Sequence, residues 1–161
     1  MPGIREELEN DPENSCFGCG AMNPKGLRLR FFREGERVVC DAAFDKWFSN
    51  WPGRVTAHVV AQALDCLSEW TFYTHTGQVG PTERVITQSD RPVAVGRPVQ
   101  LLGTVTQRTP EFLTVRAELL QDGELRAELE SVIRVVKNLE EFHQLRPQVD
   151  LTPEMKRLLP E

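Results

Sequence analysis

The hydrophobic positions in the middle of the chain repeat with the period of an α-helix. Between about Ala57 and Thr74 the apolar residues recur every three or four positions, which predicts an amphipathic helix. The residues of this stripe are Val60, Ala63, Leu64, Leu67 and Trp70. Gly77 and Gly80-Pro81 are typical of the end of a helix.

After this helix the pattern changes to an alternation of apolar and polar residues, which predicts strands with one buried face. The four segments that alternate cover residues 84–90, 98–107, 113–119 and 125–135. Short turns, including the Asp122-Gly123 hairpin signal, join the later segments, so we expect them to pair antiparallel. Before the helix we expect two further strands, at Leu27–Phe31 and over Val38 to Ala42, joined by a turn at Glu34-Gly35-Glu36.

This order of elements predicts an α+β fold, with an antiparallel sheet curved around one long helix. A single helix covers only one face of a sheet, so we expect it on the concave face. Residues 1–15 are polar and predict a mobile arm or a short helix. The domain itself is expected over residues 16–137, and the tail, residues 138–161, is expected to form short helical turns.

Composition narrows the classes of protein that this chain could represent. It has 161 residues and a formal net charge of −5, which argues against a nucleic-acid-binding protein. No apolar run approaches the roughly 18–20 residues that span a bilayer, so we expect no membrane partner. The first residues, from Met1 to Glu7, contain no apolar segment typical of a signal peptide. We therefore expect a cytoplasmic protein.

Four cysteines leave a question of metal or redox chemistry open. Cys16 and Cys19 have the spacing of half a zinc site or of a redox pair, but no second pair follows. Their Gly-, Asn- and Pro-rich surroundings favour a structural turn, so the sequence predicts no metal site. A metal shared across a dimer remains the alternative. Cys40 and Cys66 are expected to be small packed apolar residues.

Four motifs, in this order and spacing, resemble the hotdog-fold acyl-CoA thioesterase superfamily, which includes 4-hydroxybenzoyl-CoA thioesterase and PaaI-like proteins. They are the segment Cys16–Leu27, Trp51-Pro52-Gly53-Arg54-Val55, Ala63-Leu64-Asp65, and Arg91-Pro92-Val93-Ala94-Val95-Gly96. The resemblance covers about residues 16–136 and implies the hotdog fold. One motif departs from the family, because Thr56-Ala57-His58 stands where the family usually has His-Gly-Gly.

The resemblance implies catalytic roles for residues of the central helix. Asp65 corresponds to the carboxylate that activates water or attacks the thioester carbonyl. The backbone N–H groups of Ala57 and His58 correspond to the oxyanion site at the helix N-terminus. Glu69, one turn after Asp65, would raise the pKa of Asp65 by like-charge repulsion. The alternatives are a solvated helix face that carries two acids, and a His58 that is bonded locally or paired with Asp65.

Further residues are expected to orient water or bind the substrate. Thr82 lies near the position of a water-orienting Thr or Ser in some relatives. Arg91 and Arg97 could bind the phosphates of coenzyme A, or be ordinary surface arginines. Trp51 belongs to an aromatic loop that either packs on the core or gates the acyl chain. Phe72 shares the helix face of Asp65, because a rotation of 100° per residue places it about 20° away.

The function that these residues predict is hydrolysis of an acyl-CoA thioester in a cleft between two chains. The alternative is a non-catalytic hotdog protein that binds an acyl or CoA-like ligand or serves in assembly. A hydratase is disfavoured, since Phe48-Ser49-Asn50 lacks the histidine that such chemistry uses. No cofactor is expected beyond the coenzyme A of the substrate. We expect a homodimer, or a homotetramer built as a dimer of dimers, because a lone curved sheet leaves strand edges unpaired.

Overall fold

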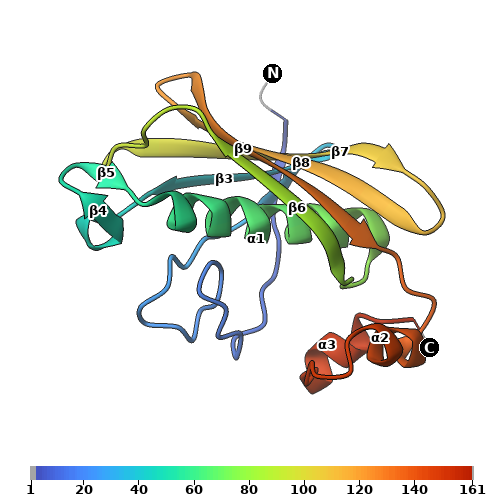
Figure 1. Cartoon of the computed structure of the whole chain (residues 1–161). Helices are drawn as coiled ribbons and strands as arrows, with labels where there is room; N and C mark the ends of the chain where they lie inside the picture. Colours follow the sequence, from blue (N-terminus) through green and yellow to red (C-terminus); the bar gives the residue numbers. More distant parts are fainter. Residues whose placement is uncertain (1–2, 161) are drawn as a thin grey trace.

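A seven-stranded antiparallel sheet curves around one long helix, α1 (Ala57–Thr76), in the computed structural model, which describes residues 3–160 (Figure 1). In spatial order the strands are β1 (Arg5–Glu7), β2 (Phe32–Glu34), β3 (Arg37–Ala43), β7 (Pro98–Arg108), β8 (Phe112–Gln121), β9 (Glu124–Arg134) and β6 (Thr82–Ser89). A short 3₁₀ turn, η1 (Lys46–Phe48), leads into a hairpin of β4 (Ser49–Trp51) and β5 (Arg54–Val55). The predicted α+β arrangement is confirmed.

The helix α1 packs its apolar stripe against the concave face of the sheet (Figure 1). Leu64 and Leu67 are completely buried there. Helix and sheet are close together at Gly103 of β7, where a Cβ atom would lie 2.1 Å from Thr71 Oγ1. The helix ends at Gly77, which adopts a left-handed conformation with φ 69° and donates its N–H to Tyr73 O at 2.7 Å. These contacts fix the position of α1 along its whole length.

The first third of the chain differs from the sequence prediction. No strand forms at Leu27–Phe31, because Arg28 has φ 52° and the neighbouring backbone bonds elsewhere. Leu27 donates its N–H to Phe17 O at 2.7 Å, and Leu29 donates to Gly18 O at 3.0 Å. The strand that pairs with β3 is instead β2, three residues long. The expected mobile arm contributes β1, which pairs with β2 at the sheet edge.

Residues 8–31 form an irregular segment on the side of α1 that faces away from the sheet (Figure 1). Its buried residues Cys19, Leu29 and Phe31 belong to the same hydrophobic core as Ala63 and Cys66 of α1. The helix therefore lies between the sheet and this segment.

The chain after β9 folds into two short helices, α2 (Leu139–Leu145) and α3 (Pro153–Arg157), beside the C-terminal end of α1 (Figure 1). They enclose a small separate core built around Phe142, Leu151 and Leu159. Arg146 joins this unit to β6 by donating to Thr82 O at 3.0 Å. Met1 and Pro2 of the expected arm, and Glu161 of the expected tail, lie outside the described residues.

Strand β6 forms one long edge of the sheet and has no neighbouring strand on its outer side within residues 3–160. It pairs with β9 on one side only, and Val85 and Ile86 are 44% and 52% exposed. Such an edge is a template for pairing with another strand. Within residues 3–160 no helix has both the length and the apolar character needed to span a membrane.

Candidate active site

Backbone N–H groups at the N-terminus of α1 have no hydrogen-bond acceptor within residues 3–160. Thr56 caps the helix with an extended conformation, but its hydroxyl makes no capping hydrogen bond. Its carbonyl accepts from Val59 and Val60 at 3.1 and 3.2 Å, which leaves the N–H groups of Ala57 and His58. Both residues are exposed, and no acidic residue occupies the first turn of the helix. This terminus can therefore stabilise a negative charge.

A pocket of about 290 Å³ lies beside this helix terminus. Three of the predicted residues, Trp51, Ala57 and Arg91, line it together. Arg54 and Asp90 also line it, and the sequence analysis did not single them out. Arg54 lies inside the quoted Trp51–Val55 motif, so the motif could have indicated it. Trp51 is 69% exposed, so in this chain it lies at the pocket rather than over the core.

Farther along α1, two carboxyl groups and a hydroxyl come together. Thr82, at the start of β6, donates its hydroxyl to the carboxyl group of Glu69. Burial raises the pKa of Glu69 to about 7, with the Thr82 bond opposing and the charge of Asp65 adding to the effect. Burial also raises the pKa of Asp65, and the negative charge of Cys16 contributes. Desolvated carboxyl groups of this kind are typical of general bases that operate near neutral pH.

Two of the predicted substrate residues take other roles. Phe72 is completely buried and packs with Leu113, Val115 and Ile133, so it is a core residue. The helical rotation did not predict this, because Phe72 packs against β8 and β9, and the chain near Gly80 also covers its ring: a Cβ on Gly80 would lie 2.8 Å from it. The prediction that Phe72 contacts the substrate is therefore wrong.

The two predicted phosphate-binding arginines both form ion pairs with the β8–β9 turn. Arg91 donates to Glu124 at 3.0 Å and Arg97 to Asp122 at 2.5 Å. Asp122 and Gly123 have φ 57° and 75°, so the predicted hairpin turn is present. Arg91 still lines the pocket near α1, whereas Arg97 does not. Arg97 is better explained as a structural contact to this turn.

His58 does not form the pair with Asp65 that the sequence left open. No hydrogen bond or ion pair joins them in the described chain, and seven residues of helix separate them by about 10 Å. The same rise separates Ala57 from Asp65 by about 12 Å. The helix terminus and the carboxyl group of Asp65 therefore lie at two different places along one chain.

Sequence reasoning missed Cys66, which was expected to be a packed apolar residue. Its Sγ lies 3.6 Å from Cys16 Sγ, although 50 positions separate the two in the chain. Cys19 completes a group of three thiols. Hydrogen bonds from the thiols of Cys19 and Cys66 lower the pKa of Cys16, and the same contacts with Cys16 raise the pKa of both neighbours. Only the three-dimensional fold reveals this group.

Searches against protein-family models and against curated proteins return no match for this chain. Solved structures do match. A thioesterase superfamily protein aligns with TM-score 0.66 and 20% identity over 77% of this chain, which spans 59% of that protein's length. Zebrafish thioesterase superfamily member 2 aligns with TM-score 0.64 and 15% identity, covering 72% of this chain and 90% of its own.

A third structure, the phenylacetic acid degradation protein PaaI from Thermus thermophilus, aligns with TM-score 0.61 and 15% identity. That alignment covers 67% of this chain and 93% of PaaI. At these identities the likeness establishes the fold. The chain has the hotdog fold of thioesterase superfamily proteins, as the sequence motifs predict.

Proposed function

We propose that the protein hydrolyses an acyl-CoA thioester, with Asp65 as general base or nucleophile. The observation that carries this proposal is the group formed by Asp65, Glu69 and Thr82, which holds two desolvated carboxyl groups beside the open edge of β6. A carboxylate with a raised pKa is a stronger base, because it gains more when it takes a proton. The shared fold with thioesterase superfamily proteins supports the same reaction.

A second element of the mechanism is the N-terminus of α1. The N–H groups of Ala57 and His58 would donate to the thioester oxygen and stabilise the oxyanion as the carbonyl is attacked. The adjacent pocket contains Arg54 and Arg91, which could bind the phosphates of coenzyme A.

The distance along α1 implies that two chains build each site. The oxyanion donor and the attacking carboxylate, or its water, must both lie within about 3 Å of one carbonyl group. Ala57 and Asp65 of the same helix are about 12 Å apart and cannot meet this condition together. We therefore infer that the helix terminus of one chain works with Asp65 of a second copy, as in a homodimer joined along the open β6 edge.

A different function is favoured by one observation, the side chains at the helix terminus. Ala57 and His58 carry Cβ atoms close to the N–H groups, where family members usually have glycine. If these atoms keep the thioester away, the protein would bind an acyl or CoA-like ligand without hydrolysing it. No cofactor enters either proposal.

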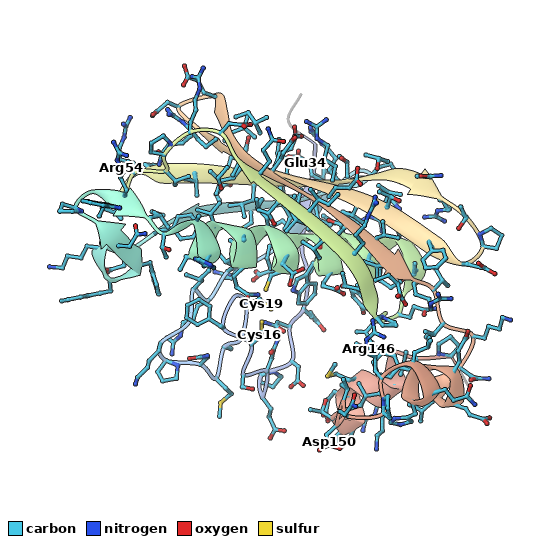
Figure 2. The ribbon with its side chains drawn as sticks, in the orientation of Figure 1. Cys16, Cys19, Glu34, Arg54, Arg146 and Asp150 are labelled. Atoms are coloured by element: carbon cyan, nitrogen blue, oxygen red, sulfur yellow. The ribbon has the colours of Figure 1, made fainter. Side chains whose placement is uncertain are left out.

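A panel of short, long and aromatic acyl-CoA esters, followed by loss of thioester absorbance, tests the reaction. We expect turnover with at least one ester and a fall in kcat of more than about 100-fold in Asp65→Asn. Asp150→Asn is the matched control, because Asp150 is an exposed carboxylate far from α1 (Figure 2). Unchanged kcat in Asp65→Asn would refute the assigned role, and CoA binding without turnover of any ester would support the non-catalytic function.

Mixed dimers test the composite site. Ala57→Pro removes one N–H group, while proline at the first position of a helix is well tolerated. Thr56, with φ −62° and ψ 139°, already has the conformation preferred before proline. Each variant alone should be inactive, whereas a dimer of one Ala57→Pro chain and one Asp65→Asn chain should regain about half of the wild-type activity, since one intact site remains. Inactive mixed dimers would place the whole site within a single chain.

A further inference from the structure

Three cysteine thiols from two distant parts of the chain converge on one point. Cys16 and Cys19 belong to the irregular segment of residues 8–31, and Cys66 belongs to α1. Their three sulfur atoms all lie within 4.8 Å of one another, and those of Cys16 and Cys66 are 3.6 Å apart. Cys19 and Cys66 are buried, whereas Cys16 is half-buried. Figure 2 shows Cys16 and Cys19 below α1, on the side away from the sheet.

The groups around these sulfurs are hydrogen-bond donors. Asn14 directs its side-chain Nδ2 at Cys19 Sγ at 3.5 Å, and Gln62 directs Nε2 at Cys66 Sγ at 3.4 Å. N–H donors that point at sulfur stabilise thiolates rather than thiols, because a thiolate is the stronger acceptor. These two donors can therefore stabilise the sulfurs of Cys19 and Cys66 once a metal ion has displaced their protons.

The segment that carries Cys16 is held in place before any ligand is considered. Asn14 Oδ1 accepts from Cys16 N at 2.8 Å, and Asn10 Nδ2 donates to Cys19 O at 2.6 Å. Gly18 allows the segment to approach α1, since a Cβ atom there would lie 2.2 Å from Cys66 Sγ. Because glycine has no side chain, the Cys66 thiol of α1 can lie next to the turn that carries Cys16 and Cys19.

We propose that Cys16, Cys19 and Cys66 together bind one zinc ion. Zinc–sulfur bonds of about 2.3 Å in a tetrahedron place two sulfurs about 3.8 Å apart, which is close to the separation of Cys16 and Cys66. Soft thiolate ligands select zinc over the hard cations. The three thiols would release their protons to solvent on binding.

The fourth ligand in this proposal is a solvent molecule, admitted at the half-buried Cys16. Within residues 3–160, no histidine, carboxylate or further cysteine has a ligand atom within 4.8 Å of all three sulfurs. The ion would fasten the segment of residues 8–31 to α1, and so hold one side of the helix that carries Asp65. Cys66 follows Asp65 in the chain and the charge of Cys16 acts on Asp65, so a bound ion would change the charge beside that carboxyl group; metal binding itself can be measured without any substrate.

Cys40 provides a control within the same chain. It is completely buried in β3, outside the group of three thiols, and burial raises its pKa to about 12. Cys40→Ala should therefore leave metal binding unchanged, whereas Cys16→Ser and Cys66→Ser each remove one ligand.

The first experiment is elemental analysis of protein produced with zinc supplied and purified under reducing, oxygen-free conditions. We expect about one zinc per chain in the wild type and in Cys40→Ala, and less than about a tenth of that in Cys16→Ser or Cys66→Ser. Gln62→Ala, which removes a donor to sulfur but no ligand, should weaken zinc affinity about 10–100-fold. Circular dichroism shows whether each variant keeps its fold.

The second experiment uses the wild-type chain alone and so does not depend on variants that fold. The metal-free, reduced protein is titrated with Co²⁺, and we expect a thiolate-to-cobalt charge-transfer band that saturates at about one ion per chain and disappears when zinc is added. X-ray absorption on the zinc form should count three sulfur neighbours. The proposal is overturned if the reduced wild type takes up neither metal, if Cys66→Ser retains wild-type affinity, or if a Cys16–Cys66 disulfide forms and its reduction does not restore metal uptake.

Discussion

The carboxyl group of Glu69 makes the stability of the protein depend on pH in a direction that can be derived. Its ordinary pKa of 4.5 rises to about 7 in the folded chain, mainly because of burial. The folded state therefore keeps a proton between these two values where the unfolded state has lost it. Stability must fall as the pH rises from about 4.5 to about 7, since the folded state binds more protons.

Glu69→Gln isolates this effect, because glutamine has the same shape, cannot ionise and can still accept from Thr82. A difference between 4.5 and about 7 corresponds to about 3 kcal/mol, at about 1.4 kcal/mol per pH unit. Part of the surface of Glu69 is exposed, so screening by solvent makes the free-energy difference smaller than this. We expect the variant to be about 1–2 kcal/mol more stable than the wild type above pH 7, and equal to it below pH 4.5.

Urea denaturation followed by circular dichroism, at about pH 5 and about pH 8.5 and at one fixed protein concentration, measures the difference. Glu111→Gln is the control, because Glu111 is exposed in the turn between β7 and β8. It should change stability by less than about 0.5 kcal/mol at either pH. If Glu69→Gln gives no gain at the higher pH, or the same gain at both, the reasoning from burial is wrong.

Three further substitutions test the packing and the assembly. Phe72→Ala should lower the free energy of unfolding in urea by about 3–5 kcal/mol, as expected for a core residue, and KM for any hydrolysed ester should stay unchanged in the folded fraction. Gly103→Ala should cost about 1–3 kcal/mol in the same assay because its Cβ would meet Thr71 Oγ1; a variant of unchanged stability would contradict this close contact. Ile86→Lys places a charge on the open β6 edge and should halve the molar mass measured by light scattering, whereas an unchanged mass would move the dimer contact elsewhere.

The regular elements of this fold could be predicted because each has a strong hydrophobic period. The helix over Ala57–Thr76 and the strands β7, β8 and β9 follow directly from spacings of three to four and of two residues. The irregular segment of residues 8–31 has only a short alternation, at Leu27–Phe31, and no strand forms there. Its path depends on the left-handed Arg28 and on hydrogen bonds to Phe17 and Gly18, which local alternation cannot report.

The candidate site was predicted in part, for a similar reason. Helical rotation placed Asp65 and Glu69 on one face, but it gave no information on what covers that face, so Phe72 was misassigned. For Arg97 the sequence leaves phosphate binding and an ordinary surface role both open, because its partner, Asp122, comes near it only through the fold. Cys66 joins Cys16 across 50 positions, and no spacing rule predicts a contact of that range.

The position of β6 in the sheet determines the order in which this protein can be completed on the ribosome. β6 is synthesised directly after α1, yet its one partner strand within residues 3–160 is β9, which follows after β7 and β8. Until residue 134 has left the ribosome, β6 has no strand to join, and α1 lacks part of the surface that buries it. Strand pairings that span such long stretches of chain form slowly. If two copies pair along β6, the edge that joins them is complete only after the sheet of one chain has formed, so that pairing would follow synthesis.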